Sequence, residues 1–375
     1  MYKEENMATQ IYHRLQEQMD QYSTGFPASK SGVELKILEK LFTEEDAEIY
    51  LDLSMLLETP DGFVERTGRP GAGMAEKLED MAKKGLLFRH VKNGIKRYSA
   101  VPFVVGSYEY QLGRMDKELA ELTNSYMEET FLTGMGNNVV PLRTIPVGKS
   151  VTVVHKVAAY EDAKTIISGK DKIAVADCIC RTQQGLLDKG CEKPKEVCLL
   201  FGSHADYYVE NKMGRYIGQE EACAILDKCE EAGLVNQPAN TVNPGGMCNC
   251  CGDCCGILRA LNLQPNPGEL VYNRYWAIVD PEACSGCEAC LDRCQMNAIQ
   301  MGAIQMGATE MDETAKINPA RCIGCGLCVT TCPMEAIQLE EKPKDLHVAL
   351  PASGQALMSI TAEKRGTSLI PLKMQ

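Results

Sequence analysis

The placement of its cysteines constrains this chain more than any other feature. All nineteen fall between Cys178 and Cys332 of a 375-residue sequence. Eight of them form two runs with the pattern C-x2-C-x2-C-x3-C, and each cysteine of the second run lies 38 residues after its counterpart. The runs are Cys284, Cys287, Cys290, Cys294 and Cys322, Cys325, Cys328, Cys332. An internal repeat of this kind predicts a unit that is built twice and packed around a pseudo-twofold axis.

The residues around the two runs repeat as well. Pro281 and Pro319 precede the first cysteine of each run by three residues, and Ala298-Ile299-Gln300 matches Ala336-Ile337-Gln338. With these features the segment 280–341 resembles the bacterial two-cluster ferredoxins. That resemblance implies two 4Fe-4S clusters and one-electron transfer, with each cluster taking three cysteines from one run and the fourth from the other. It assigns Cys284, Cys287, Cys290 and Cys332 to one cluster, and Cys322, Cys325, Cys328 and Cys294 to the other.

Zinc held by four cysteines is the alternative for this segment, but it needs only one quartet and gives no reason for the repeat. Two features depart from the family pattern. Gln295 follows the fourth cysteine of the first run, where the family has proline, which predicts a less rigid loop without the loss of a ligand. The linker repeats Ala298-Ile-Gln-Met-Gly directly as Ala303-Ile-Gln-Met-Gly, which predicts a longer hairpin at the edge of the module.

Length and composition indicate a soluble protein of two or three domains. Hydrophobic residues make up 45% of the chain and charged residues 24%, and no apolar stretch approaches the roughly 18 residues of a membrane span. The first twenty residues lack the apolar core of a signal peptide, so we expect a cytoplasmic protein, in which clustered cysteines hold metal more often than they form disulfides. The net charge of −12 disfavours nonspecific nucleic-acid binding. No haem-attachment motif and no P-loop are present.

Residues 1–130 have the pattern of a mostly helical domain. Helices are expected over Val33–Leu41, Glu44–Leu57 and Ala72–Lys84, with a break at Pro60-Asp61-Gly62. The Asn93-Gly94 pair between two β-rich runs then predicts a hairpin. Three helices followed by a hairpin resemble a winged-helix domain.

The corner of this domain that would meet DNA is basic. It contains Lys83, Lys84, Arg89, Lys92, Lys96 and Arg97. DNA binding is therefore one interpretation and a protein-interaction role the other, and the acidic balance of the chain favours the second. A further helix over Tyr108–Glu129 is expected to lead into the next domain.

Residues 137–273 are expected to form a small, mixed α/β, cysteine-rich domain. Strands are predicted over Pro146–Val154 and Lys172–Ala176, and helices over Tyr160–Ser168 and Gln219–Ala232. Its cysteines form two groups in the sequence. The first, Cys178, Cys180, Cys191 and Cys198, offers four thiolates for a third iron–sulfur cluster, with Arg181 beside them. The second, Cys248, Cys250, Cys251, Cys254 and Cys255, is so crowded that only some of its members are expected to be ligands.

Structural zinc and unligated buried cysteines are the alternatives for this domain. Cys223 and Cys229 lie on the helix between the two groups, and the stretch 264–268 reads as a linker. The tail, residues 343–375, is weakly patterned and is expected to pack as a loose strap.

The fold class that follows is α+β and multidomain: a winged-helix-like helical domain, a small mixed cysteine-rich domain and a duplicated ββ/α ferredoxin-like module. This order of parts resembles the cysteine-rich 4Fe-4S-binding proteins of strict anaerobes. We expect an electron-transfer protein that serves a partner oxidoreductase rather than a stand-alone enzyme. A redox-sensing transcription regulator is the alternative. A third hypothesis, an enzyme with His204, Asp206 and Tyr207 as acid/base groups, competes with simple packing of these residues.

Overall fold

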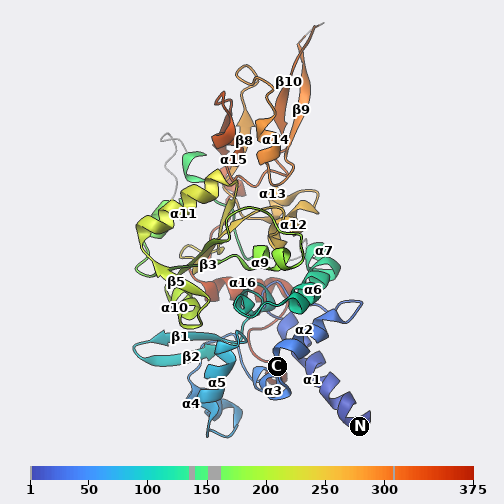
Figure 1. The fold of residues 1–375 in the computed structure, drawn as a ribbon, viewed down its shortest axis with the longest axis vertical. Helices are drawn as coiled ribbons and strands as arrows, with labels where there is room; N and C mark the ends of the chain where they lie inside the picture. Colours follow the sequence, from blue (N-terminus) through green and yellow to red (C-terminus); the bar gives the residue numbers. More distant parts are fainter. Residues whose placement is uncertain (1, 135–139, 151–161, 307–308) are drawn as a thin grey trace.

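The chain is divided into a helical end, a central sheet and a cysteine-rich module at the opposite end (Figure 1). The computed structural model describes residues 2–134, 140–150, 162–306 and 309–375. We call residues 2–134 the N-terminal unit, 140–150 with 162–273 the central unit, 274–341 the module and 343–375 the tail. Within the described residues, no helix has the length and apolar character needed to cross a bilayer.

The N-terminal unit contains most of its predicted elements. The helix predicted over Val33–Leu41 has those bounds, and the hairpin turns at Asn93 and Gly94, whose φ angles are 52° and 74°. The unit's elements are α1 (Tyr2–Asp20), α2 (Val33–Leu41), α3 (Glu44–Tyr50), α4 (Pro60–Thr67), α5 (Met74–Lys83), β1 (Phe88–Lys92), β2 (Ile95–Ser99), α6 (Lys117–Tyr126) and α7 (Leu132–Gly134).

Three boundaries in this unit were predicted wrongly. The helix expected to reach Leu57 ends at Tyr50, and the segment beyond it meets the tail, where the backbone N–H of Met55 donates to the carbonyl of Leu369. Pro60 begins α4 and does not mark a break: Thr59 caps the helix, and proline loses no hydrogen bond at the first helical position. The helix expected from Tyr108 starts only at Lys117.

A five-stranded antiparallel sheet, in the order β5-β3-β4-β7-β6, forms the central unit. One face of β3 and β4 packs against α8 and α11, whereas the opposite face looks toward α10 and the N-terminal unit. The elements are α8 (Ala163–Ser168), β3 (Ile173–Asp177), α9 (Ile179–Leu186), β4 (Glu196–Phe201), α10 (Ser203–Glu210), β5 (Gly214–Ile217), α11 (Gln219–Glu231), β6 (Val235–Pro238), β7 (Gly246–Cys250), α12 (Gly256–Asn262) and α13 (Pro267–Leu270).

Predictions for this unit held best where periodicity was clear. The strand at 172–176 and the helix that ends before Gly233 are confirmed. The strand predicted over Pro146–Val154 is wrong for residues 146–150, which include a 3-10 turn at Gly148–Ser150, and residues 151–154 lie outside the described ranges. The helix predicted from Tyr160 is described from Ala163 onward, and residues 160–161 again fall outside.

The module consists of two halves with the same elements at a spacing of 38 residues. Its left-handed backbone positions recur at that spacing too: Gly286 and Gly324 both have φ 68°, and Asn297 and Glu335 have φ 50° and 53°. β8 pairs with β11, and the duplicated linker extends the hairpin of β9 and β10. The elements are β8 (Tyr275–Val279), α14 (Ala289–Arg293), β9 (Ile299–Met306), β10 (Thr309–Ile317), α15 (Leu327–Thr331) and β11 (Ile337–Glu341).

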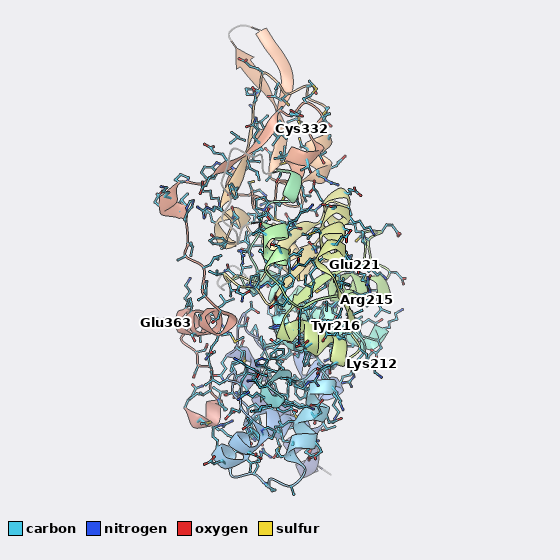
Figure 2. All side chains as sticks on the ribbon, turned by 90° about the vertical axis from the view of Figure 1, so that its left-hand side faces the viewer. Lys212, Arg215, Tyr216, Glu221, Cys332 and Glu363 are labelled. Carbon is cyan, nitrogen blue, oxygen red and sulfur yellow. The ribbon has the colours of Figure 1, made fainter. Side chains whose placement is uncertain are left out.

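The tail runs back from the module to the N-terminal unit along one side of the molecule, with Glu363 on α16 (Gly354–Arg365) midway (Figure 2). It touches the central unit where Val242 N–H donates to the Pro351 carbonyl at 2.9 Å. Beyond α16, Thr367 donates to the Gln21 carbonyl at 2.8 Å and the Leu372 N–H donates to the Gln18 side chain at 2.8 Å. The tail therefore ties the two ends of the molecule together.

Candidate metal centres

Two cavities in the module, each of about 20 Å³, are each lined by four cysteines drawn from both runs. Three of the four come from one run, and the fourth is the last cysteine of the other. The first cavity is lined by Cys284, Cys287, Cys290 and Cys332, and the second by Cys294, Cys322, Cys325 and Cys328. These are the two quartets that the crossed assignment names.

The backbone of the module comes close enough to its sulfur atoms to donate hydrogen bonds to them. The Ala277 N–H lies 3.4 Å from Cys322 Sγ, and the Ala298 N–H lies 3.3 Å from Cys294 Sγ. Gly324 is required on this loop, because a Cβ at that position would lie 2.3 Å from the Tyr275 carbonyl oxygen. Donors of this kind orient thiolate ligands and tune the charge that a metal centre can carry.

The second cavity is the more buried of the two. Burial raises the pKa of Cys325 to about 12, and burial also raises the pKa values of Cys322 and Cys328. These thiols are therefore protonated without metal, and metal binding must release their protons. In the first cavity Cys287 is exposed.

Gln295, which stands where the family has proline, joins the module to the central unit. Its side-chain oxygen accepts from the Gly252 N–H at 2.6 Å, and its side-chain nitrogen donates to the Gly233 carbonyl at 3.1 Å. Asn262 also donates to the Gln295 carbonyl at 2.7 Å. The loop that was expected to be less rigid is thus fixed by contacts outside the module.

A larger cavity of about 60 Å³ lies between the central sheet and the N-terminal unit. Its cysteines come from β4, β7, the region where β3 leads into α9, and the start of α12. They are Cys178, Cys180, Cys198, Cys248, Cys250, Cys254 and Cys255. Much of the remaining wall is apolar, including Val104, Phe131 and Ile257, so a group bound there would be held mainly by sulfur.

Six sulfur atoms follow one another as hydrogen-bonded neighbours around this cavity, in the order Cys198, Cys248, Cys250, Cys255, Cys180, Cys178. Hydrogen bonds from Cys198 and Cys250 hold the pKa of Cys248 well below its usual range. Hydrogen bonds from Cys180 and Cys250 lower the pKa of Cys255 to about 5. Both shifts favour negative charge among the sulfur atoms of this cavity.

The chain favours negative charge here through its helix ends. Cys178 is the N-cap residue of α9 and Cys255 the N-cap residue of α12, so each lies at a helix end where the helix dipole favours negative charge. The thiol count, the lowered pKa values of Cys248 and Cys255 and the two helix ends fit a thiolate-bound iron–sulfur cluster.

A second group of three cysteines shares Cys254 with the wall of this cavity and otherwise lies outside it. Cys191 Sγ is 3.8 Å from Cys251 Sγ and 3.7 Å from Cys254 Sγ, and all three sulfur atoms lie within 4.8 Å of one another. A hydrogen bond from the Cys254 thiol, aided by the Cys254 N–H and by Arg181, lowers the pKa of Cys251 to about 5 against the effect of burial. We call these three residues the thiol trio.

In the folded protein the central cysteines form other groups than they do in the sequence. Cys191 lies with Cys251 and Cys254, and not with the cysteines of its own sequence group. The row of six sulfur atoms combines Cys178, Cys180 and Cys198 with members of the second sequence group. Of the four cysteines between 250 and 255, Cys250 and Cys255 belong to the row of six sulfur atoms, and Cys251 and Cys254 belong to the trio. Adjacent residues of an extended segment face opposite sides. The close spacing of the cysteines was therefore the sequence signal that indicated a division into two groups. Cys223 and Cys229 do not line the large cavity and do not belong to the trio.

Sequence reasoning missed the contribution of the N-terminal unit to the large cavity. Glu109 lies on the cavity wall, and burial raises its pKa to about 8 although the Gly106 N–H donates to it. Tyr108, also on the wall, donates to the Gln183 side chain at 2.6 Å. No local motif marks either residue, because only the packing of two units brings them to the cysteines.

The three residues considered as acid/base groups serve packing and pairing. The His204 ring stacks on Phe88 at 4.8 Å, and the Tyr207 hydroxyl donates to the carbonyls of Ala82 and Leu87 at 2.8 and 2.7 Å. Asp206 pairs with Lys172 at 2.8 Å. His204 and Tyr207 thus hold α10 against the N-terminal unit, whereas Asp206 pairs within the central unit.

The comparisons with known proteins bear on the module alone. Residues 283–337 match a family model described as a 4Fe-4S dicluster domain. No curated protein and no solved structure matches the chain. The module is therefore a ferredoxin-like iron–sulfur module that binds 4Fe-4S clusters, which gives the chain a role in electron transfer.

Proposed function

We propose that this protein carries single electrons between a partner oxidoreductase and an iron–sulfur centre in its own central unit, in anaerobic metabolism. Two 4Fe-4S clusters in the duplicated module relay the electrons. Cluster I is held by Cys284, Cys287, Cys290 and Cys332, and cluster II by Cys322, Cys325, Cys328 and Cys294. A third cluster is bound in the large cavity by four of the six neighbouring sulfur atoms, a set that does not include Cys254. The observation that carries the proposal is that each assigned quartet lines a cavity of its own.

The order of the relay follows from burial and contacts. Cluster I lies beside the exposed Cys287, and Met334 on the same cavity wall is 50% exposed. Cluster II is the more buried and adjoins the junction, since Gln295 directly follows Cys294 and bonds to Gly252. Electrons therefore enter or leave at cluster I and reach the central unit through cluster II.

The partner surface that suits cluster I is apolar at its centre and basic at its edge. Met334 supplies an apolar contact beside Cys287, and the exposed carboxylate of Glu288 lies on the same wall. A net charge of −12 adds long-range attraction for a basic partner. Association should then slow as salt is raised.

The central unit supports a third cluster through the number and state of its thiols. Six neighbouring sulfur atoms exceed the four that one cubane requires. Hydrogen bonds from neighbouring thiols lower the pKa values of two of them, Cys248 and Cys255, which favours the proton loss that cluster assembly requires.

The contacts of the winged-helix-like N-terminal unit favour an internal role over DNA binding. Arg89, only 3% exposed, pairs with Glu79 at 2.7 Å and with Glu210 on α10 at 2.5 Å. Lys84 pairs with Asp46 at 3.2 Å. These pairs neutralise part of the basic corner, and α10 covers the end of α5. A transcription regulator would need this surface free.

Metal analysis of the anaerobically purified full chain tests the proposal. Iron and acid-labile sulfide should each reach about twelve per chain for three cubane clusters, whereas about eight would confine the clusters to the module. EPR of the dithionite-reduced protein should show interacting S = 1/2 centres. Protein without acid-labile sulfide would rule out the electron-transfer function.

A further inference from the structure

The thiol trio has the dimensions of a site for one metal ion. A tetrahedral ion with metal–sulfur bonds of about 2.3 Å, as for zinc, holds its thiolates about 3.8 Å apart. In the trio, the sulfur atom of Cys191 lies 3.8 Å from that of Cys251 and 3.7 Å from that of Cys254. The thiolates of a cubane lie further apart, because each binds a different iron atom.

The local backbone has the form of a metal knuckle. Cys251 and Cys254 flank Gly252-Asp253 in a C-x2-C turn, and the Cys254 N–H donates back to the Cys251 sulfur. The Cys255 N–H donates to the Cys251 carbonyl at 3.1 Å, which closes the turn. Cys191 comes from a separate segment between α9 and β4, so a bound ion would join two segments 60 residues apart.

Charge balance favours a divalent ion. Arg181, 1% exposed, places Nη1 3.5 Å from Cys251 Sγ and donates through Nη2 to the Asn249 carbonyl at 3.0 Å. Within the described ranges, no carboxylate forms an ion pair with Arg181. Three thiolates with one divalent cation carry a single negative charge, which this guanidinium neutralises. The nearby Asp253 is already paired with Lys193 at 2.6 Å.

We propose that Cys191, Cys251 and Cys254 bind one zinc ion, separate from the iron–sulfur clusters, and that Arg181 offsets the remaining negative charge. Zinc suits three soft ligands in tetrahedral geometry and has no redox chemistry that would interrupt the electron relay. The ion fixes the peptide of Gly252, whose N–H donates to Gln295, and so braces the junction between the central unit and the module.

Metal content of the full chain, purified anaerobically with zinc in the growth medium, tests this proposal. The wild-type protein should retain about one zinc per chain. Cys191→Ser and Cys254→Ser should lose most of that zinc while iron and sulfide stay at the wild-type level. Cys223→Ser is the matched control, because Cys223 lies in the same unit outside the trio, and it should keep its zinc.

Zinc K-edge absorption of the wild-type protein gives a readout that needs no variant and ignores the iron. It should show at least three sulfur atoms at about 2.3 Å. Three results would overturn the proposal: no zinc above background in the wild type, a loss of iron in Cys254→Ser equal to that of a whole cluster, or a Cys251–Cys254 disulfide detected by mass spectrometry after alkylation. Iron and sulfide report on the electron-transfer proposal and zinc on this one, so each can fail without the other.

Discussion

Replacing Gln295 with alanine should loosen the junction between the module and the central unit. The substitution removes two side-chain hydrogen bonds, from the Gly252 N–H at 2.6 Å and to the Gly233 carbonyl at 3.1 Å. Each such bond contributes about 1 kcal/mol net, so we expect the loss of both to cost about 2 kcal/mol. That corresponds to roughly 30-fold more frequent local opening.

Hydrogen exchange followed by mass spectrometry measures this opening without unfolding the clusters. Peptides that cover 231–236 and 250–256 should exchange roughly 30-fold faster in Gln295→Ala, while peptides from β8 and β11 should not change. Gln295→Glu should have an intermediate effect, because a carboxylate accepts from Gly252 but cannot donate to Gly233.

The control is Gln338→Ala, which alters an exposed glutamine of the same module. It should leave exchange at the junction unchanged. If exchange at 250–256 in Gln295→Ala stays close to the wild-type rate, the two hydrogen bonds do not hold the junction and the reasoning fails.

Three further predictions concern ligation, packing and pH. Cys294→Ser and Cys325→Ser should perturb the EPR signal of the same cluster, whereas Cys290→Ser should perturb the signal of the other, although Cys294 and Cys290 belong to the same run. If Cys294→Ser and Cys290→Ser perturb the same signal, the assignment is refuted. Arg89→Ala should cost about 3 kcal/mol and lower the first thermal transition, because Glu79 and Glu210 lose a buried partner, whereas the exposed Lys92→Ala should shift it little. Burial lowers the pKa of His204 to about 4 from an ordinary value of about 6.5, so the unfolded chain binds the proton first and stability should fall as pH drops below about 6.5. His204→Phe should flatten the pH dependence of thermal unfolding between pH 6.5 and 5, and an unchanged slope would contradict this origin.

Features set by short-range chemistry could be predicted from the sequence. The cysteine spacing, through the family it resembles, predicted the module and the quartets whose members line its two cavities. The Asn93-Gly94 pair predicted the hairpin, because a two-residue turn depends on neighbours in the chain. The end of α3 at Tyr50 was not predicted, since no glycine or proline marks it in the sequence. The division of the central cysteines was likewise hidden: Cys191 and Cys251 meet only after the segment before β4 folds against the turn that follows β7. The sequence predicts a less rigid loop at Gln295, because it does not reveal that the hydrogen-bond partners of this residue lie in another unit.

The tail has a consequence for the order in which the protein can be completed during synthesis. Thr367, Leu372 and Lys373 contact Gln21, Gln18 and Asp52. Residues synthesised 346 and 354 positions later thus complete the packing around Gln21 and Gln18 of the first unit. A chain made at about 5–20 residues per second exposes both cysteine regions well before those contacts form. The surface of the N-terminal unit that the tail covers thus stays open until the tail has been synthesised. Closure by the tail is then a late step, and it comes after the cysteines have become available to metal.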